Sequence, residues 1–183
     1  ATVFLSLLTM AITSALGACV GLVSGFFRNR IDDVLMRICD VMMSFPSEVM
    51  ILAIVGMTGP GLENVVIANV VAKWPWYARM VRSIVRQYSD KDYIRFAKVA
   101  GGSSIRIMMR HLLPGTAGEL FVLTTLDTGS VILMISALSF LGLGVQPPTP
   151  EWGMMLNEAK EVMTLYPLQM IPAGMAILLV VAA

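Results

Sequence analysis

The chain has 183 residues and a net charge of +1, and 57% of its residues are hydrophobic while 14% are charged. With a mean hydropathy of +0.78, it carries more apolar surface than one soluble core of this length can bury, which excludes an ordinary soluble domain. We therefore expect a single membrane-embedded domain over residues 1–183.

The first apolar segment, residues 3–27, is predicted to span the membrane. No basic stretch precedes it and its apolar character continues to Phe27, so it is not a signal peptide. Gly17, Gly21 and Gly25 lie four residues apart, which leaves one helix face almost without side chains. A neighbouring helix can approach closely there, and it could belong to the same chain or to another subunit.

Four further apolar segments follow along the chain. They are residues 36–58, 63–84, 114–143 and 168 to the end. Lys73, Pro75 and Arg79 interrupt the third of the five spans. The fourth carries Glu119 and Asp127 and is longer than the roughly 20 residues that a span needs, so we expect it to be tilted, broken or extended. The fold class is thus all-α, a polytopic transmembrane helix bundle.

Basic residues are unevenly distributed among the segments that connect these spans. Eleven of the 13 lie between spans one and two or between spans three and four. The opposite segments, 59–64 and 144–167, hold four glutamates and one basic residue, Lys160. Because Lys and Arg are retained on the cytoplasmic side during insertion, the loop 85–112 is predicted to be cytoplasmic in a multi-pass protein.

Within this loop, residues 89–113 carry the most informative pattern. Ser89 and Asp92 are spaced as in a capping box, which predicts the start of a short helix. Arg95 and Lys98 lie on one face of this helix. Its apolar stripe consists of Tyr93, Phe96, Ala97 and Ala100.

Two glycines, Gly101 and Gly102, are expected to end that helix, because glycine adopts the left-handed conformation common at helix C-termini. A second amphipathic segment follows, capped by Ser103 or Ser104 and interrupted at Pro114. Its apolar stripe consists of Ile105, Met108, Met109 and Leu112. Such a pair of segments can dock in a groove of another protein or lie flat on anionic lipid, and the physical pattern favours neither.

Counted from position 95, the loop reads Arg-Phe-Ala, three residues, Gly101, nine residues, His111, one residue, and Leu113-Pro114. This spacing resembles the cytoplasmic loop of prokaryotic ATP-binding-cassette (ABC) importer permeases, where the pattern is Glu-Ala-Ala, three residues, Gly, nine residues, Ile, one residue, and Leu-Pro. Arg95 replaces the usual Glu and His111 the usual Ile. The resemblance implies an ATPase-coupling loop formed by Arg95, Phe96, Ala97, Ala100, Gly101, Gly102, His111, Leu113 and Pro114.

Residues 30–46, 74–83 and 139–155 also resemble the second permease subunit of the dipeptide, oligopeptide and nickel branch of these importers. The runs WPWYARMVRS, TLDTGS and YPLQM are most similar to nickel-uptake permeases. The resemblance implies a type I ABC importer permease architecture with six core helices. Because the chain starts without Met and ends in an apolar run, we expect a fragment truncated at both ends that lacks the first of these helices.

The resemblance further implies the location and partners of the protein. It would lie in a prokaryotic cell (inner) membrane, in contact with lipid, and form a heterodimer with a second permease subunit. Two cytoplasmic ATPase subunits would bind the loops, and an extracytoplasmic solute-binding protein would deliver the solute; no nucleic acid is involved. The implied solute is nickel, chelated, or a related transition metal, and the alternative within the branch is a di- or oligopeptide.

The sequence contains no motif for catalysis by this chain. No lysine follows a glycine, so a P-loop is absent, and neither HExxH nor GxSxG occurs. We expect no catalytic residue and no cofactor here, with ATP and magnesium held by the partner ATPases. The cysteines, Cys19 and Cys39, lack CxxC spacing and are expected to pack within helices.

Ionisable residues within spans are costly and are therefore candidates for function. Glu48 follows an expected kink at Pro46, and Asp127 lies in the middle of the fourth span. Each could line a solute pathway or serve a structural hydrogen-bond network. Lys73, beside Trp74, is expected to extend to the membrane interface instead.

Fifteen methionines invite a metal-binding interpretation, but thioethers prefer Cu(I)-like ions and nickel favours imidazole, which the spans lack. We therefore expect no metal site in this chain, and a nickel solute would cross as a chelate or on ligands from the partner subunit. The predicted mechanism is mechanical, with the ATPases moving residues 89–113 and thereby switching the pathway. Alternatives from other classes are a self-contained secondary transporter or channel, which would usually show inverted repeats, and a scaffold.

Overall fold

The computed structural model describes residues 1–182, and these residues contain helices, turns and irregular segments without a β-strand. They form two compact units. Unit 1 comprises Ala1–Ala11, Pro46–Ala72 and Thr125–Ala183, and unit 2 comprises Ile12–Phe45 and Lys73–Thr124.

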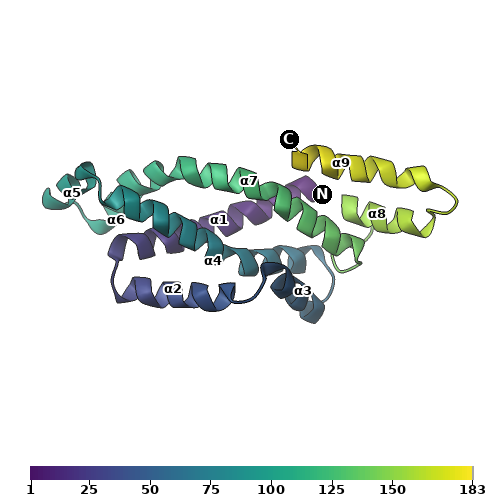
Figure 1. Cartoon of the computed structure of the whole chain (residues 1–183), viewed down its shortest axis with the longest axis horizontal. Helices are drawn as coiled ribbons and strands as arrows, with labels where there is room; N and C mark the ends of the chain where they lie inside the picture. The colour runs from purple at the N-terminus through teal and green to yellow at the C-terminus, as the bar shows by residue number, and fades with distance from the viewer. Residues whose placement is uncertain (183) are drawn as a thin grey trace. The chain divides into compact units, whose positions relative to one another are not determined.

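The helices follow one another along the chain as coloured in Figure 1. They are α1 (Thr2–Phe27), α2 (Arg30–Met43), α3 (Ser47–Thr58), α4 (Leu62–Ser89), α5 (Asp92–Val99), α6 (Ser104–Ile107), the π-turn η1 (Met108–Leu112), α7 (Leu113–Phe140), α8 (Trp152–Glu161), the short 3₁₀ turn η2 (Pro167–Gln169) and α9 (Met170–Ala182). The all-α prediction is confirmed.

Two helices in the described part of the chain are long and apolar enough to cross a membrane. They are α1 and the continuous helix Ser104–Phe140, and a third span results if the bent pair α2 and α3 is counted as one. Two other helices are not long or apolar enough to count as spans. The helix α4 contains several charged residues, and α9 has only 13 residues. The full set of five spans stays a prediction.

The predicted span 36–58 is not one helix. It is divided between α2 and α3, with Ser44, Phe45 and Pro46 between them. Proline has no backbone N–H and disfavours the helical conformation of the preceding residue, so the expected kink at Pro46 becomes a complete break. By contrast α4 continues through Pro75, which the sequence had marked as an interruption.

The glycine face of α1 packs on α4 within unit 2, which resolves the choice left open by the sequence. A Cβ at Gly21 would lie 2.6 Å from the carbonyl oxygen of Ala78, and one at Gly25 would lie 2.8 Å from Cβ of Val85. A side chain at either position would therefore force the helices apart. The close approach predicted from the glycine spacing is an intrachain contact.

The core of unit 2 also includes the loop between α4 and α7. Ile94 of α5, Ile107 of α6 and Leu112 of η1 are buried together with Val81 and Val85 of α4. Because its apolar side chains contribute to this core, the loop is folded onto the helices of unit 2.

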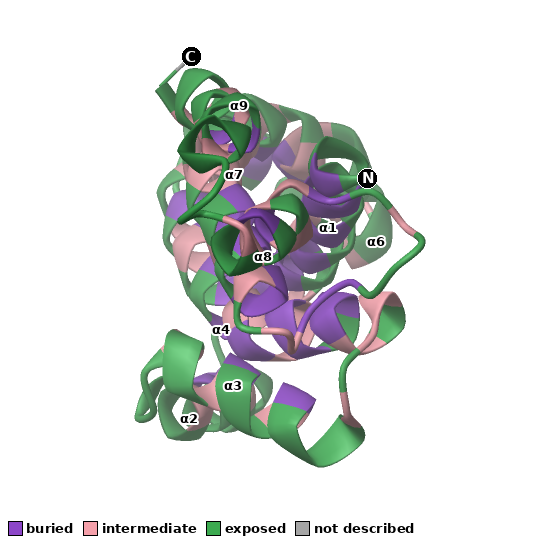
Figure 2. Ribbon diagram, turned by 90° about the vertical axis from the view of Figure 1, so that its right-hand side faces the viewer, coloured by how far each residue is buried: buried purple, intermediate pink, exposed green. Residues whose placement is uncertain are grey.

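In unit 1, the segment between α7 and α9 is fixed by α8. A Cβ at Gly153 would overlap the backbone of Ser136 in α7, so only glycine permits this contact. Glu151, at the N-terminus of α8, is 1% exposed. Figure 2 shows the buried residues at the start of α8, whereas much of α2 and α3 is exposed.

Candidate functional site

The loop predicted to couple to an ATPase begins with the helix α5, but not through the expected capping box. Ser89 is the last residue of α4, and the N-cap of α5 is Lys91. Because α4 extends further than predicted, Ser89 lies too early to cap a helix that starts at Asp92. The capping-box prediction is therefore wrong, while the helix itself is confirmed.

The glycine pair ends α5 as predicted. Gly101 has φ of +77°, the left-handed conformation that L residues rarely adopt. The N–H of Gly101 donates to the carbonyl of Lys98 at 3.1 Å, and the N–H of Gly102 donates to that of Ala97 at 3.0 Å. These two bonds form a Schellman motif, which reverses the chain between the two helical segments.

The second segment begins at the predicted cap, since the Ser103 hydroxyl accepts a 3.4 Å hydrogen bond from the N–H of Arg106. The predicted interruption at Pro114 is wrong. The π-turn η1 precedes this proline, and the helix continues from Ser104 to Phe140. A π-turn rearranges the backbone hydrogen bonds, so the missing N–H of a proline need not end the helix. The fourth span is therefore not broken, and its tilt or extension beyond the membrane stays a prediction.

The apolar residues of the loop face in two directions. Ile94 and Ile107, which the predicted stripes omitted, are buried. Phe96, which was placed in a stripe, is 73% exposed, and Ala97 packs against the core. The loop thus carries an exposed apolar surface, which we call the loop surface. It consists of Tyr93, Phe96, Val99, Ile105 and Met109.

The other residues of the family-like pattern lie on the same folded element. Arg95 and Ala100 are exposed on or next to α5. His111 is half-buried in η1, and Leu113 and Pro114 begin α7. The structure therefore brings the predicted coupling residues into one contiguous helix–glycine–helix segment.

The start of this loop is anchored to the turn between α1 and α2. A guanidinium nitrogen of Arg28 lies 3.0 Å from a carboxylate oxygen of Asp90, and another donates to the carbonyl of Arg86 at 2.7 Å. The hydrogen bond from Arg28 holds the pKa of Asp90 below its ordinary value, because it stabilises the carboxylate form of Asp90. In addition, the Lys98 ammonium lies 4.8 Å from the centre of the Phe26 ring.

A charged cluster that the sequence did not reveal joins α1, α2 and α4. Asp32 is 3% exposed and accepts two hydrogen bonds from Arg82, at 2.5 and 2.7 Å. Arg86 and the hydroxyl of Ser24 also donate to this carboxylate. A buried charge is tolerated when it is paired and hydrogen-bonded, as it is here. The available sequence signal was the i, i+4 spacing of the two arginines on one face of α4.

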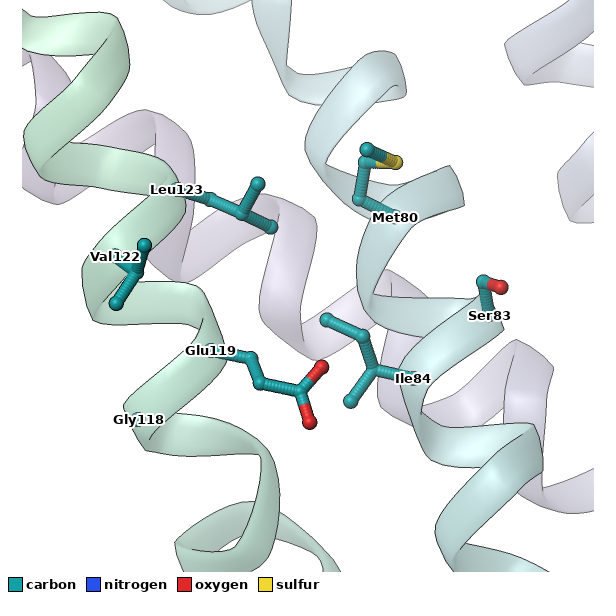
Figure 3. A pocket seen from close by; sticks show the side chains of 7 residues that line it. All are labelled: Met80, Ser83, Ile84, Gly118, Glu119, Val122 and Leu123. Carbon is teal, nitrogen blue, oxygen red and sulfur yellow. The ribbon is translucent and has the colours of Figure 1, made fainter.

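A groove with a volume of about 440 Å³ lies between α4 and α7 in unit 2. Figure 3 shows Glu119 reaching from α7 toward Ile84 of α4. The Tyr88 hydroxyl donates a 3.1 Å hydrogen bond to Glu119 and thereby joins the two helices on either side of the loop. The remaining lining is mostly apolar and includes Met80, Val122 and Leu123.

The candidate pathway residues lie on different helices. Glu48 is exposed in the first turn of α3, where the Ser47 hydroxyl donates to it at 3.0 Å. Asp127 is half-buried in α7, and Lys73 is half-buried in α4. Neither acid belongs to the folded loop. Among residues 1–182, no three or more His, Cys, Asp and Glu side chains are grouped so as to hold a metal ion.

The long apolar helices, together with a folded basic loop, are those of a membrane protein. Residues 17–183 match the family described as binding-protein-dependent transport system inner membrane component. The chain belongs to this family, whose members have the type I ABC importer permease fold.

Three similar proteins illustrate the range of the branch. The metal-staphylopine import system permease protein CntC of Staphylococcus aureus (strain Mu50) is 44% identical over 84% of this chain and 53% of that protein. The nickel transport system permease protein NikC of Escherichia coli (strain K12) is 39% identical over 92% of this chain and 61% of that protein. The glutathione transport system permease protein GsiD of Escherichia coli O6:K15:H31 is 41% identical over 94% and 57%, respectively. The chain thus spans little more than half the length of these relatives.

Proposed function

We propose that this chain forms half of the translocation pathway of an ATP-driven importer, as one of two permease subunits. The family and the names of the relatives support this role. The observation that carries the proposal is the loop surface, because its large apolar side chains stand outward on a segment that is itself anchored and folded. A rigid element with exposed apolar residues suits docking into a groove of another protein.

In this proposal two cytoplasmic ATPase subunits bind the loops of the two permease subunits, which in this chain is the coupling loop, residues 89–113, and this chain performs no hydrolysis. The loop continues into α4 on one side and into α7 on the other, since Ser104–Phe140 is a single helix. Nucleotide-driven movement of the loop would therefore be passed to both helices, which would switch the pathway between outward and inward access. The excess of basic residues supports a cytoplasmic location for the loop in a multi-pass inner-membrane protein.

The proposed solute is nickel as a chelate, or a related transition metal. The relatives named for metal-staphylopine and nickel support it, and the former name describes a chelated metal. A peptide-like solute is the second candidate, because the glutathione permease is similarly identical to this chain. An extracytoplasmic binding protein would deliver either solute. Glu48 and Asp127 are proposed to contact it, each as a carboxylate within a largely apolar helix.

Cysteine crosslinking tests the coupling role. Val99 and Ser103 are exposed and are better positions than the half-buried Ala97, so each is replaced by cysteine in a chain without Cys19 and Cys39. We expect crosslinks to the ATPase subunits in native membranes, with a yield that changes when ATP is added. Ile94→Cys is the matched control on the same helix, because Ile94 is 0% exposed and should not react.

The alternatives predict different results. A loop that lies on lipid would give no crosslink to any ATPase and would be protected from aqueous thiol reagents by the membrane. A secondary transporter or channel would keep transporting nickel supplied with histidine, or glutathione, after removal of the ATPases. Either result would contradict the proposed function.

A further inference from the structure

We propose that Arg28 and Asp32 are positioning residues of the coupling mechanism, which lock α2 to the end of α4 that leads into the loop. The α2 helix and the loop would then move as one body when the ATPases act. This inference rests on the proposed function. There, movement of the loop is passed to α4 and α7, and the inference adds α2 as a further helix that moves with the loop.

The contacts that hold α2 follow one stripe of this helix. Asp32, Met36 and Cys39 are its buried residues, at the i, i+4 and i+7 spacing of one helical face. Met36 and Cys39 pack with Ala78 of α4. The Asp32 carboxylate continues this stripe toward the loop and binds Arg82 and Arg86. An apolar contact alone can slide, whereas a bidentate pair with Arg82 fixes both distance and orientation.

The turn that precedes α2 provides a second observation that supports this lock. Arg28 has φ of +47°, a conformation that normally favours glycine at a helix end. The strained residue is nevertheless an arginine, whose side chain reaches both Asp90 and the carbonyl of Arg86. A turn that had only to reverse the chain would be easier to build with glycine. Besides a 3.4 Å hydrogen bond to the carbonyl of Gly25 in α1, this side chain thus makes two contacts where α4 gives way to the loop, so it has a use beyond the turn.

Distance measurement between spin labels tests the lock in the complete importer, with full-length subunits. One label replaces the exposed Val34 of α2 and the other replaces the exposed Ser103 of the loop. We expect this distance to be the same with and without ATP in the parent protein. In Asp32→Asn and in Arg28→Gly it should broaden and become nucleotide-dependent. Asp33→Asn is the matched control, since this neighbouring carboxylate is exposed on α2.

Transport per ATP provides the readout that a purely structural role would not change. We expect Arg28→Gly to assemble normally, because glycine suits the backbone of this turn, and to keep ATP hydrolysis. Uptake of nickel supplied with histidine, or of glutathione, should fall about fivefold or more per ATP hydrolysed, the size of an ordinary coupling free energy. Asp32→Glu should recover part of the loss of Asp32→Asn.

The opposite outcomes overturn the inference. A Val34–Ser103 distance that changes with ATP in the parent protein would show that α2 and the loop are not one body. Unchanged uptake per ATP in both variants would show that the lock plays no part in coupling. If Val99 gives no crosslink to the ATPases while the labelled distance stays fixed, the proposed function fails and the contacts serve the fold alone.

Discussion

The hydroxyl of Ser136 in α7 donates a 3.1 Å hydrogen bond to Glu151 at the N-terminus of α8. The same carboxylate accepts a 3.0 Å bond from the hydroxyl of Thr2 in α1 and another from the N–H of Met154. Glu151 is thus a buried acid that joins three helices of unit 1 through neutral donors. The donors satisfy the carboxylate, and the buried hydroxyls of Thr2 and Ser136 in turn depend on it as their hydrogen-bond acceptor.

We predict that Glu151→Ala destabilises the protein by about 2 kcal/mol or more, because it leaves the hydroxyls of Thr2 and Ser136 without their acceptor. Thermal unfolding in detergent, followed by loss of the monodisperse peak in size-exclusion chromatography, measures the change. Glu158→Ala is the control, since Glu158 is exposed on the same helix. Equal midpoints for the two variants would contradict a structural role of the carboxylate.

The contact of α1 with α4 predicts a difference between two glycines. A Cβ at Gly21 would lie 2.6 Å from the carbonyl oxygen of Ala78, whereas one at Gly56 would meet nothing within 4 Å. Gly21→Ala should therefore lower stability by about 1–3 kcal/mol, the cost of overpacking. Gly56→Ala should raise it slightly, because alanine favours helix by up to about 1 kcal/mol. The same thermal assay compares them, and equal behaviour of the two variants would argue against close packing.

Local features of the sequence predicted local structure well. The four-residue spacing of glycines indicated a close helix contact, and the pair Gly101 and Gly102 indicated the end of α5. Ser103 was a candidate cap and is the cap. Each of these depends on the backbone of a few neighbouring residues, so no knowledge of the remaining fold was needed.

Features that depend on distant residues were missed. The pairing of Asp32 with Arg82 joins residues 50 positions apart, and no spacing rule reaches that far. The predicted capping box is absent because α4 extends to Ser89. The predicted interruption at Pro114 is absent because the π-turn η1 accommodates the proline. For the same reason the apolar stripe of α5 was misassigned, since tertiary contacts select Ile94 as the buried residue and leave Phe96 exposed.

The Schellman motif predicts that position 101 is sensitive to backbone conformation alone. Gly101 has φ of +77°, and a Cβ there would meet nothing within 4 Å. Gly101→Ala should cost about 1 kcal/mol through the left-handed conformation rather than through a clash. Gly101→Asn should cost less, because asparagine tolerates this conformation better. Thermal unfolding ranks the three residues, and an alanine variant as stable as the parent would show that the turn adopts another conformation.

Phe96 and Ile94, two residues apart on α5, should separate docking from folding. Phe96 is 73% exposed, so Phe96→Ala should leave unfolding unchanged but weaken binding of the ATPase subunits by about 1.5–3 kcal/mol, the value of burying a large apolar side chain in their groove. Ile94 is 0% exposed, so Ile94→Ala should lower stability by about 2–5 kcal/mol. Thermal unfolding together with titration of purified ATPase subunits onto the permease in detergent measures both quantities. Met57→Ala serves as the surface control, because Met57 is 81% exposed in α3 and outside the loop. If Phe96→Ala binds the ATPases as tightly as Met57→Ala does, the loop surface is not the docking site, and the exposed ring would have to face lipid.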